Sequence, residues 1–511
     1  MTEEQGGHHR VSSSLSDFSI LELDFEHGPP GVGNRGRTES VTLKEIDNIE
    51  PNDELPMASL LIVAETEKLE ETTEQGAASS SLLASLGDMD FSSYKLKVKD
   101  WDGTKFYSDY IKEGLIYNNK LEDAEKAIML YESPSSSTAE SSFHNKDKYK
   151  FHDWPPPTST ISKGLLGPLR YALMSGDTLP VFLRGGEAPD GLIDHWKKTV
   201  PGVKVPSFVP KIQVETDIVY SYLPVEQIEH HVNDPTVHYH LAGKDAIHLM
   251  TQKTTKLLAN TSICRPCVVK TTHSMGSKGI FIISNDEDER EFEEFLKESG
   301  NPTFVVTDFV DIARNVACHF YMHPNGTEIT WFGSNENHRE ADGRFSSDSY
   351  LLLDEQADLK KLQLPFIQEV VQYCNSLGFW GFCGCDVLFD SQDNGFLVDI
   401  NPRVTGSCPA LMTLHVFEKT YGFNVGLFRR SGDINFYGSN EELIEKVDAY
   451  NVENEGKSRI VLHSFLQTPS GVSRVNIGVY GTDLEDCKTV LNQFAVPKKN
   501  QDEVEAVEAG E

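Results

Sequence analysis

The sequence predicts an α/β protein whose folded part begins near residue 155. Three observations lead to this prediction. Strand-like and helix-like stretches alternate between residues 178 and 220, as in lobes built on a parallel sheet. Two apolar strands flank an Asn-Gly turn between residues 383 and 400, which is typical of a β-hairpin. Residues 1–95 are rich in Ser, Glu and Gly with few aromatics, and we expect them to be disordered because they cannot bury enough apolar surface.

The net charge and the distribution of apolar residues exclude several classes of protein. The chain has 511 residues, enough for two or three domains, and a formal net charge of −33. That charge argues against a nucleic-acid or anionic-membrane partner. The longest early apolar run, residues 57–64, is too short to span a bilayer. The polar N-terminus indicates a cytoplasmic protein, and the eight cysteines are therefore expected to be reduced thiols.

The first folded elements are expected in two segments. Residues 96–154 form an aromatic-containing segment and linker in which residues 120–131 fit a short helix. Residues 155–243 form the N-terminal parallel α/β lobe, with a buried strand at 178–182 and a helix at 191–199. Arg184, Gly185 and Gly186 follow that strand, either as a substrate loop or as a plain turn.

The next stretch combines a lysine-bearing strand with a Gly/Ser loop. Lys244 is expected at the start of a helix that runs to about Leu258. A strand at 267–270 ends in Lys270, and a second strand follows at 280–283. The loop between the strands contains Gly276, Ser277 and Gly279, and it is either a lid over phosphates or an ordinary hairpin turn. The nearby histidines at 230, 231, 238 and 240 lack acids at ligand spacing, so we do not expect a metal there.

The hairpin at 383–400 carries acids where strands rarely do. Asp399 and Asn401 share one strand face, and Asp386 on the paired strand can face them. Two carboxylates and an amide oxygen suit Mg²⁺, or Mn²⁺, which completes its shell with water and phosphate oxygens. The alternative is two ordinary strands with polar ends.

The order of these parts resembles the ATP-grasp superfamily. The matching pieces are the strand VVK, the loop GSKG, the strand FVVTDFV, the strand with Asp386, and the sequence DINPR that ends at Arg403. The resemblance covers roughly residues 165–430, although the family more often has Glu where this chain has Asp399. It implies an ATP-grasp domain of two lobes over residues 244–430, and ATP with Mg²⁺ as its cofactors.

The resemblance also implies a role for particular residues. Lys244 and Lys270 would bind ATP phosphates, and Gly276, Ser277 and Gly279 would form the lid. The backbone of Asp308, Phe309 and Val310 would hold the adenine. Asn315, or alternatively Asp311, would contact the ribose, because the family's usual acid is replaced here by Arg314-Asn315. Asp386, Asp399 and Asn401 would bind Mg²⁺. Arg403 would stabilise the transferred phosphoryl group, with Lys270 also assigned to catalysis.

The remaining elements are expected from periodicity and capping. Helices are predicted at 286–299, 359–377 and 409–417, and strands at 303–309, 316–322 and 328–332. Residues 334–339 form a polar cluster that either contacts substrate or is a loop. Residues 431–500 form a C-terminal α+β unit with strands at 459–466 and 475–480 and a helix at 484–494, and an acidic tail follows at 501–511.

Three functions remain open. The first is a ligase that activates a small-molecule carboxylate as an acyl phosphate for attack by an amine or thiol. The second is an ATP-grasp kinase that stops after phosphoryl transfer. The third is a nucleotide-binding regulatory or scaffold protein without turnover, for which the long acidic N-terminus would be suited. A homodimer is also left open. One sequence does not identify the carboxylate or the nucleophile.

Overall fold

The structure is a computed structural model that describes residues 94–133, 143, 148–152, 165–258, 265–275, 279–300, 302–339, 345–430, 435–467 and 471–494. The predicted disordered segment, apart from residues 94 and 95, and the acidic tail lie outside these ranges. Every described helix and strand belongs to one compact unit, residues 63–257 together with 265–511. No helix in the described ranges is long and apolar enough to cross a membrane.

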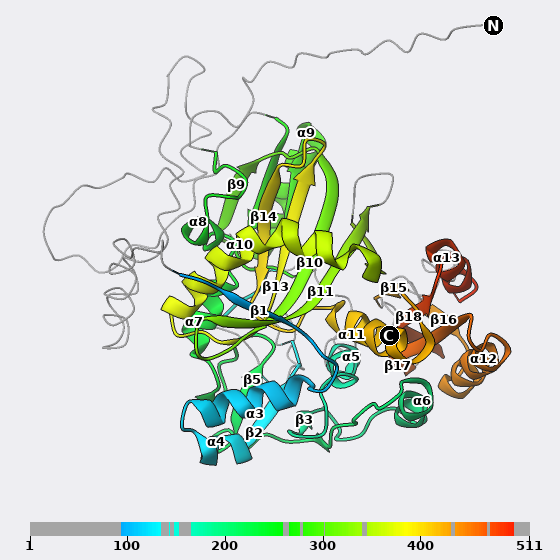
Figure 1. The fold of residues 1–511 in the computed structure, drawn as a ribbon. Helices are drawn as coiled ribbons and strands as arrows, with labels where there is room; N and C mark the ends of the chain where they lie inside the picture. The colour runs from blue at the N-terminus through cyan, green and yellow to red at the C-terminus, as the bar shows by residue number, and fades with distance from the viewer. Residues whose placement is uncertain are drawn as a thin grey trace, which may run out of the picture. The chain divides into compact units, whose positions relative to one another are not determined.

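The N-terminal lobe contains the predicted parallel sheet (Figure 1). Its five strands have the order β4 (Phe208–Val209), β3 (Val181–Phe182), β2 (Ala127–Leu130), β5 (Ile218–Ser221) and β6 (His230–His231), and all their pairings are parallel. The central strand β2 lies in the segment predicted as a helix at 120–131. That prediction was wrong, because only α4 (Leu121–Glu125) is helical and Ala127 to Leu130 are fully buried between two strands. The sheet therefore starts before residue 155.

The largest sheet carries the predicted hairpin. Its main path is β14 (Gly395–Asn401), β13 (Gly381–Asp390), β10 (Ile312–Met322), β11 (Glu328–Arg339), β12 (Phe345–Leu352), β15 (Val425–Arg429), β18 (Val472–Gly481) and β16 (Asn435–Tyr437). Strand β1 (Lys97–Asp100) pairs parallel with β11, and β17 (Ser458–Gln467) pairs with β18. The strands of the predicted C-terminal unit therefore continue the same sheet through β15.

A separate three-stranded sheet holds Lys270. It has the order β8 (Ile280–Ile283), β7 (Cys267–Thr271) and β9 (Phe304–Asp308), with both pairings antiparallel. Helix α9 (Asp286–Ser299) packs on it through Phe292, Phe295 and Leu296. Its amide N–H groups at Glu287 and Asp288 are capped by the Asn285 side chain. The strands and the helix predicted here are confirmed.

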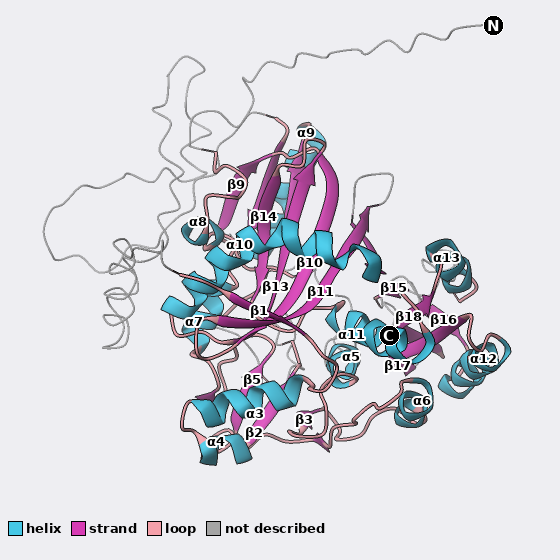
Figure 2. Cartoon of the chain, in the orientation of Figure 1, coloured by secondary structure: helices cyan, strands magenta, loops and turns pink. Residues whose placement is uncertain are grey.

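Helices from distant parts of the chain share one core with the sheets. This core includes side chains of α3 (Tyr107–Tyr117), α5 (Gly167–Ala172), α6 (Leu192–Thr199), α11 (Cys408–Tyr421), α12 (Asn440–Glu453) and α13 (Leu484–Asn492). A second core lies between β10, β13 and the helix α10 (Gln356–Ser376), which crosses the large sheet in Figure 2. The helix predicted at 484–494 is confirmed as α13, and Asp483 accepts from the backbone N–H of Asp486.

One local prediction was wrong, and one of the two alternatives for another segment is excluded. The helix expected from Lys244 to Leu258 is only the short α8 (Ile247–Met250), which follows α7 (Pro235–Leu241). Beyond it the chain pairs with strands, because Thr254 bridges Leu397 and Leu257 bridges Thr307. The polar cluster 334–339 is not a loop but the continuation of β11, with the Asn335 side chain fully buried.

Candidate functional site

The hairpin of β13 and β14 brings the predicted metal acids together. Asp386 lies directly opposite Asp399, and Gly384 lies opposite Asn401. Side chains at opposed positions share a face of the sheet, so the two carboxylates converge. Asn401 Nδ2 donates to Asp386 Oδ2 over 3.2 Å. At the turn, Asp390 accepts from the N–H groups of Gln392 and Asn394, which fixes the register.

Burial and the closeness of the second carboxylate disfavour the charged form of Asp386. Desolvation, followed by the neighbouring Asp399 carboxylate, raises the pKa of Asp386 to about 7, against the opposing effect of Lys244, Arg430 and Arg403. No cluster of three or more His, Cys, Asp or Glu side chains that could hold a metal occurs in the described ranges. A cation here would therefore have two carboxylates and the amide as its protein ligands, which fits Mg²⁺ because that ion retains water and phosphate oxygens.

Two buried lysines face the same place from different segments. Lys244 Nζ lies 3.3 Å from Asp399 Oδ1 and donates to Ser274 O over 3.5 Å. Lys270 on β7 is 8% exposed. Burial first, and then the charge of Lys244, lowers the pKa of Lys270 to about 8 although Asp399 and Asp308 oppose this. An anionic ligand would stabilise two cations that are held together away from water.

Arg403 is placed by the residues that follow β14. It is 7% exposed, its guanidinium donates through Nη2 to Asn401 Oδ1, and its centre lies 5.0 Å from the ring of Tyr222. The loop 403–407 lies directly on β13, since a Cβ at Gly384 would stand 2.3 Å from Thr405 Cγ2. Only glycine allows this approach.

A polar network that the sequence did not reveal fixes the loop from the other side. His319 Nε2 lies 2.6 Å from Asn335 Oδ1, and Ser407 Oγ donates to the same oxygen over 2.7 Å. Thr405 Oγ1 shares a further hydrogen bond with His319 Nδ1. Burial lowers the pKa of His319 to about 4, so the imidazole is neutral. The alternating pattern of β10 and β11 was the signal that could have placed His319 and Asn335 on one face.

The predicted nucleotide contacts lie at the end of β9 and on β10. The Asp308 backbone N–H donates to Lys256 O over 3.1 Å, and its carboxylate accepts from the Lys256 N–H over 2.8 Å. Asp308 is thus engaged with the protein, whereas no hydrogen bond to the backbone N–H of Phe309 or Val310 occurs within the described part of the chain. Asn315 is 7% exposed, and its buried Oδ1 has no hydrogen-bond partner among the described residues.

Other sequence candidates are accounted for by protein contacts. Arg314 pairs with Glu336 and Glu355 at 3.0 and 2.9 Å. Arg184 pairs with the buried Glu132, and the Gly186 N–H donates to Leu183 O, so this segment forms a turn. Six of the described cysteines are free and buried, namely Cys318, Cys374, Cys383, Cys385, Cys408 and Cys487. Gly276 and Ser277 lie outside the described residues, while Gly279 has a φ of +70°.

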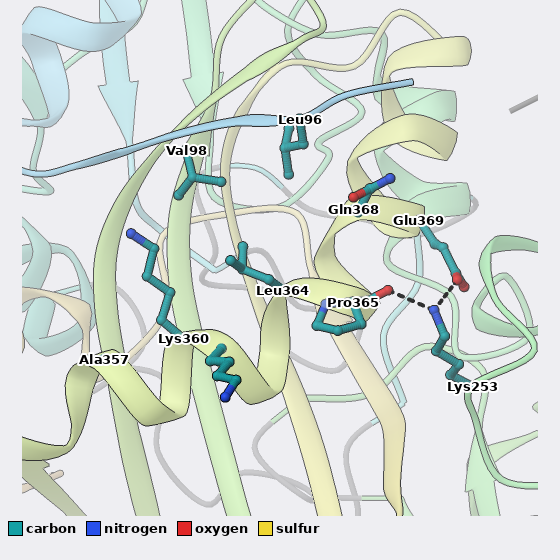
Figure 3. Close-up of a pocket in the computed structure, with 10 residues that line it drawn as sticks. Leu96, Val98, Lys253, Ala357, Lys360, Leu364, Pro365, Gln368 and Glu369 are labelled. Atoms are coloured by element: carbon teal, nitrogen blue, oxygen red, sulfur yellow. Dashed lines mark hydrogen bonds and ion pairs between the residues drawn. The ribbon is translucent and has the colours of Figure 1, made fainter. Parts of the chain in front are cut away.

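One pocket of about 560 Å³ lies elsewhere, between β1 and α10 (Figure 3). Its apolar lining includes Leu96, Val98 and Leu364, and Lys253 donates to Pro365 O over 3.0 Å at its rim. None of the predicted site residues lines this pocket.

A comparison with protein families gives a match over the middle of the chain. Residues 225–401 match the family model described as "L-aspartate--L-methionine ligase, ATP grasp". The match covers about a third of the chain and contains both lysines, both aspartates and Asn401, and it ends two residues before Arg403. No curated protein sequence matches significantly.

Similar folds occur among solved structures. The N5-carboxyaminoimidazole synthetase of Staphylococcus aureus, complexed with ADP, is 13% identical with a TM-score of 0.41, over 65% of this chain and 93% of that chain. The L-amino acid ligase of Bacillus licheniformis is 12% identical with a TM-score of 0.38, over 62% of this chain and 90% of that chain. The carboxyaminoimidazole ribonucleotide synthase of Aspergillus clavatus, complexed with ATP, is 12% identical with a TM-score of 0.37, over 77% of this chain and 96% of that chain.

Proposed function

We propose that this chain, a member of the ATP-grasp superfamily, is a Mg-ATP-dependent ligase that joins a carboxylate to an amine. One observation carries the proposal. Asp386 and Asp399 face each other across the hairpin, Lys244 is paired with Asp399, and Arg403 is bonded to Asn401. Acids for a metal, cations for phosphates and a guanidinium for the reacting group thus meet at one place.

The chemistry needs two steps. A carboxylate oxygen of the substrate attacks the γ-phosphorus of ATP, the bond from that phosphorus to the β,γ-bridging oxygen breaks, and ADP leaves. The amine nitrogen then attacks the carbonyl carbon of the acyl phosphate, phosphate leaves, and the nitrogen loses a proton. The protein mainly positions the reactants and neutralises charge on the phosphoryl group.

Each residue has a defined part in this proposal. Lys244 and Lys270 bind ATP phosphates, and the backbone at Phe309 and Val310 holds the adenine. Asn315 accepts a hydrogen bond from a ribose hydroxyl through its free Oδ1. Asp386, Asp399 and Asn401 would hold Mg²⁺, which supplies charge stabilisation to the phosphate oxygens. Arg403 stabilises the acyl phosphate, and the loop of Gly276, Ser277 and Gly279 closes over the phosphates.

The substrates are proposed to be amino acids, because the family model that matches is described for L-aspartate and L-methionine. The aspartate would supply the carboxylate and the methionine the amine. We also propose that the protein acts in the cytoplasm, which the free thiols of Cys318, Cys383 and Cys385 support.

The experiment measures ADP release from Mg-ATP with pooled L-amino acids, and mass spectrometry identifies the product. Wild type should release ADP and phosphate only when an acid and an amine are both present. Asp399→Asn should lower kcat about 100-fold or more. The variant would lack one of the two carboxylates that hold the metal at the phosphate oxygens.

The control is Asp358→Asn, the same change at an exposed position in the first turn of α10. It should retain wild-type turnover. A phosphorylated acid as the final product would instead indicate a kinase. ADP release that is identical in wild type and Asp399→Asn would count against the site.

A further inference from the structure

Three arginines from distant parts of the chain converge beside the carboxylate pair. Arg170 lies in α5 of the N-terminal lobe, Arg403 follows β14, and Arg430 follows β15. A Cβ built on Gly406 would lie 3.4 Å from Arg430 Cδ and 3.7 Å from Arg170 Nη2. Gly406 precedes Ser407, the N-cap of the 14-residue helix α11, so these cations meet where a helix N-terminus also favours an anion.

Within the described ranges, none of these three guanidiniums forms an ion pair with a carboxylate. The Nε atoms of Arg170 and Arg403 are buried with no hydrogen-bond partner among the described residues. No ion pair joins Arg430 to any residue in the described ranges. Its neighbour Arg429, in contrast, is bonded through Nη2 to Asp348 over 2.6 Å.

Tyrosines fill the space between the arginines without neutralising them. Arg170 Nη2 donates to Tyr171 Oη over 2.7 Å, and Tyr171 Oη donates to Tyr222 Oη over 3.1 Å. Burial alone would raise the pKa of Tyr222, but Arg403 and Arg170 bring it below its usual value. Burial and the charge of Arg170 lower the pKa of Arg430. Both directions indicate a cluster that is short of negative charge.

In the proposed function, ATP and the reacting carboxylate have partners other than Arg170 and Arg430. In the proposed function, Lys244, Lys270 and the metal face the phosphates, and Arg403 faces the group that is activated. Arg170 then has no assigned anion, and the Asp386 carboxylate that acts on Arg430 would be bound to the metal. A planar guanidinium pair at short range matches a carboxylate.

We propose that Arg170 and Arg430 bind a second, non-reacting carboxylate of the acid substrate, so that the site selects a dicarboxylic amino acid over a monocarboxylic one. The proposal rests on the proposed function of the same site, because it names the acid that the ligase activates. It assigns substrate recognition to Arg170 of the N-terminal lobe and to Arg430 after β15, and both residues lie outside the family match.

The test is calorimetric binding in the presence of Mg²⁺ and AMP-PNP. L-Aspartate and L-glutamate are compared with L-asparagine, aspartic acid α-amide and L-glutamine. Wild type should bind at least one dicarboxylic amino acid about 10- to 100-fold more tightly than its amides, the value of a charge-assisted hydrogen-bond pair. Arg430→Met and Arg170→Met should each reduce this preference below about threefold.

The matched control is Arg459→Met, which removes a guanidinium that stacks 4.7 Å from the ring of Tyr421, the same distance as Arg170 from Tyr171. It should keep the preference. Thermal unfolding and AMP-PNP affinity verify that each variant is folded. If Arg430→Met does not fold, Arg430→Lys replaces it in the binding test. The wild-type comparison requires no variant.

Several outcomes would overturn the proposal. They are equal affinity for acids and amides, no binding of either dicarboxylic amino acid, an unchanged preference in Arg430→Met, or tighter binding of O-phospho-L-serine than of both acids. Turnover assays separate this result from the ligase proposal. Efficient turnover of monocarboxylic amino acids would leave the ligase and remove the subsite. Selective binding without acid-dependent ADP release would leave the subsite and remove the ligase.

Discussion

At the scale of single residues, Lys270 illustrates how burial prepares a charge for a ligand. The residue is 8% exposed, and burial, followed by the charge of Lys244, lowers its pKa to about 8 in the free protein. The phosphates of ATP would supply the missing negative charge. Binding and protonation are therefore linked at this lysine.

We predict that nucleotide binding at pH about 8.5 takes up protons at Lys270. Above pH 8 the free lysine is mostly neutral, and adjacent phosphates raise its pKa, so the complex gains a proton. Calorimetry of AMP-PNP binding in buffers of different ionisation enthalpy measures this uptake. Lys270→Met should abolish it and weaken binding, whereas Lys361→Met, at an exposed position in α10, should not. Equal uptake in wild type and Lys270→Met would contradict the prediction.

At the scale of elements, the loop 403–407 is held between two strands. Gly384 allows it to lie on β13, and Ser407 is bonded to Asn335 of β11. The hairpin thus places the acids, and this loop places the arginine beside them. The positions of the acids and of Arg403 depend on each other, because the loop continues directly from β14.

We predict that Ser407→Ala lowers the free energy of unfolding by about 1–3 kcal/mol, since the buried Asn335 amide loses a donor. It should also raise the KM for the acid substrate, because Arg403 is in the same loop. Urea unfolding and steady-state kinetics measure both. Ser376→Ala removes a hydroxyl that donates to Tyr373 O at a partly exposed position, and it should leave the KM unchanged. A Ser407→Ala protein with wild-type stability and KM would be inconsistent with this role.

At the scale of the whole molecule, the N-terminal lobe and the C-terminal strands share a core. Trp196 on α6 is fully buried, and its indole N–H donates to Leu462 O on β17 over 2.9 Å. The His195 ring also accepts from the Leu462 N–H over 3.0 Å. Since Arg170 and Arg430 come from these two parts, their junction affects the proposed substrate subsite.

We predict that Trp196→Phe loosens this junction and lowers the urea midpoint, because the buried Leu462 carbonyl loses its donor. Limited proteolysis should then release a C-terminal fragment that wild type does not release. Trp101→Phe is the matched control, because its indole N–H donates to Lys105 O only four residues away. The same fragment from both variants, or from neither, would argue against the junction as a coupling element.

The local elements and the order of site residues were predictable from the sequence. The 383–400 hairpin follows from alternation and turn residues, and α9 follows from its Asn285 cap and apolar face. Opposed positions on a hairpin are close neighbours, so Asp386 and Asp399 could be placed together without a structure. The family match covers residues 225–401, a range that includes Asp386 and Asp399.

Only the tertiary structure decided which distant segments meet. The short strand β2 (Ala127–Leu130) is held between β3 and β5, and a local helical pattern gives no sign of those partners. The helix expected after Lys244 ends at Met250, because residues 254 and 257 pair with strands. Arg170 and Arg430 are 260 residues apart, and no local pattern places them over Gly406. Sequence periodicity specifies what a segment can form on its own, whereas burial against partners far along the chain selects what it forms in the protein.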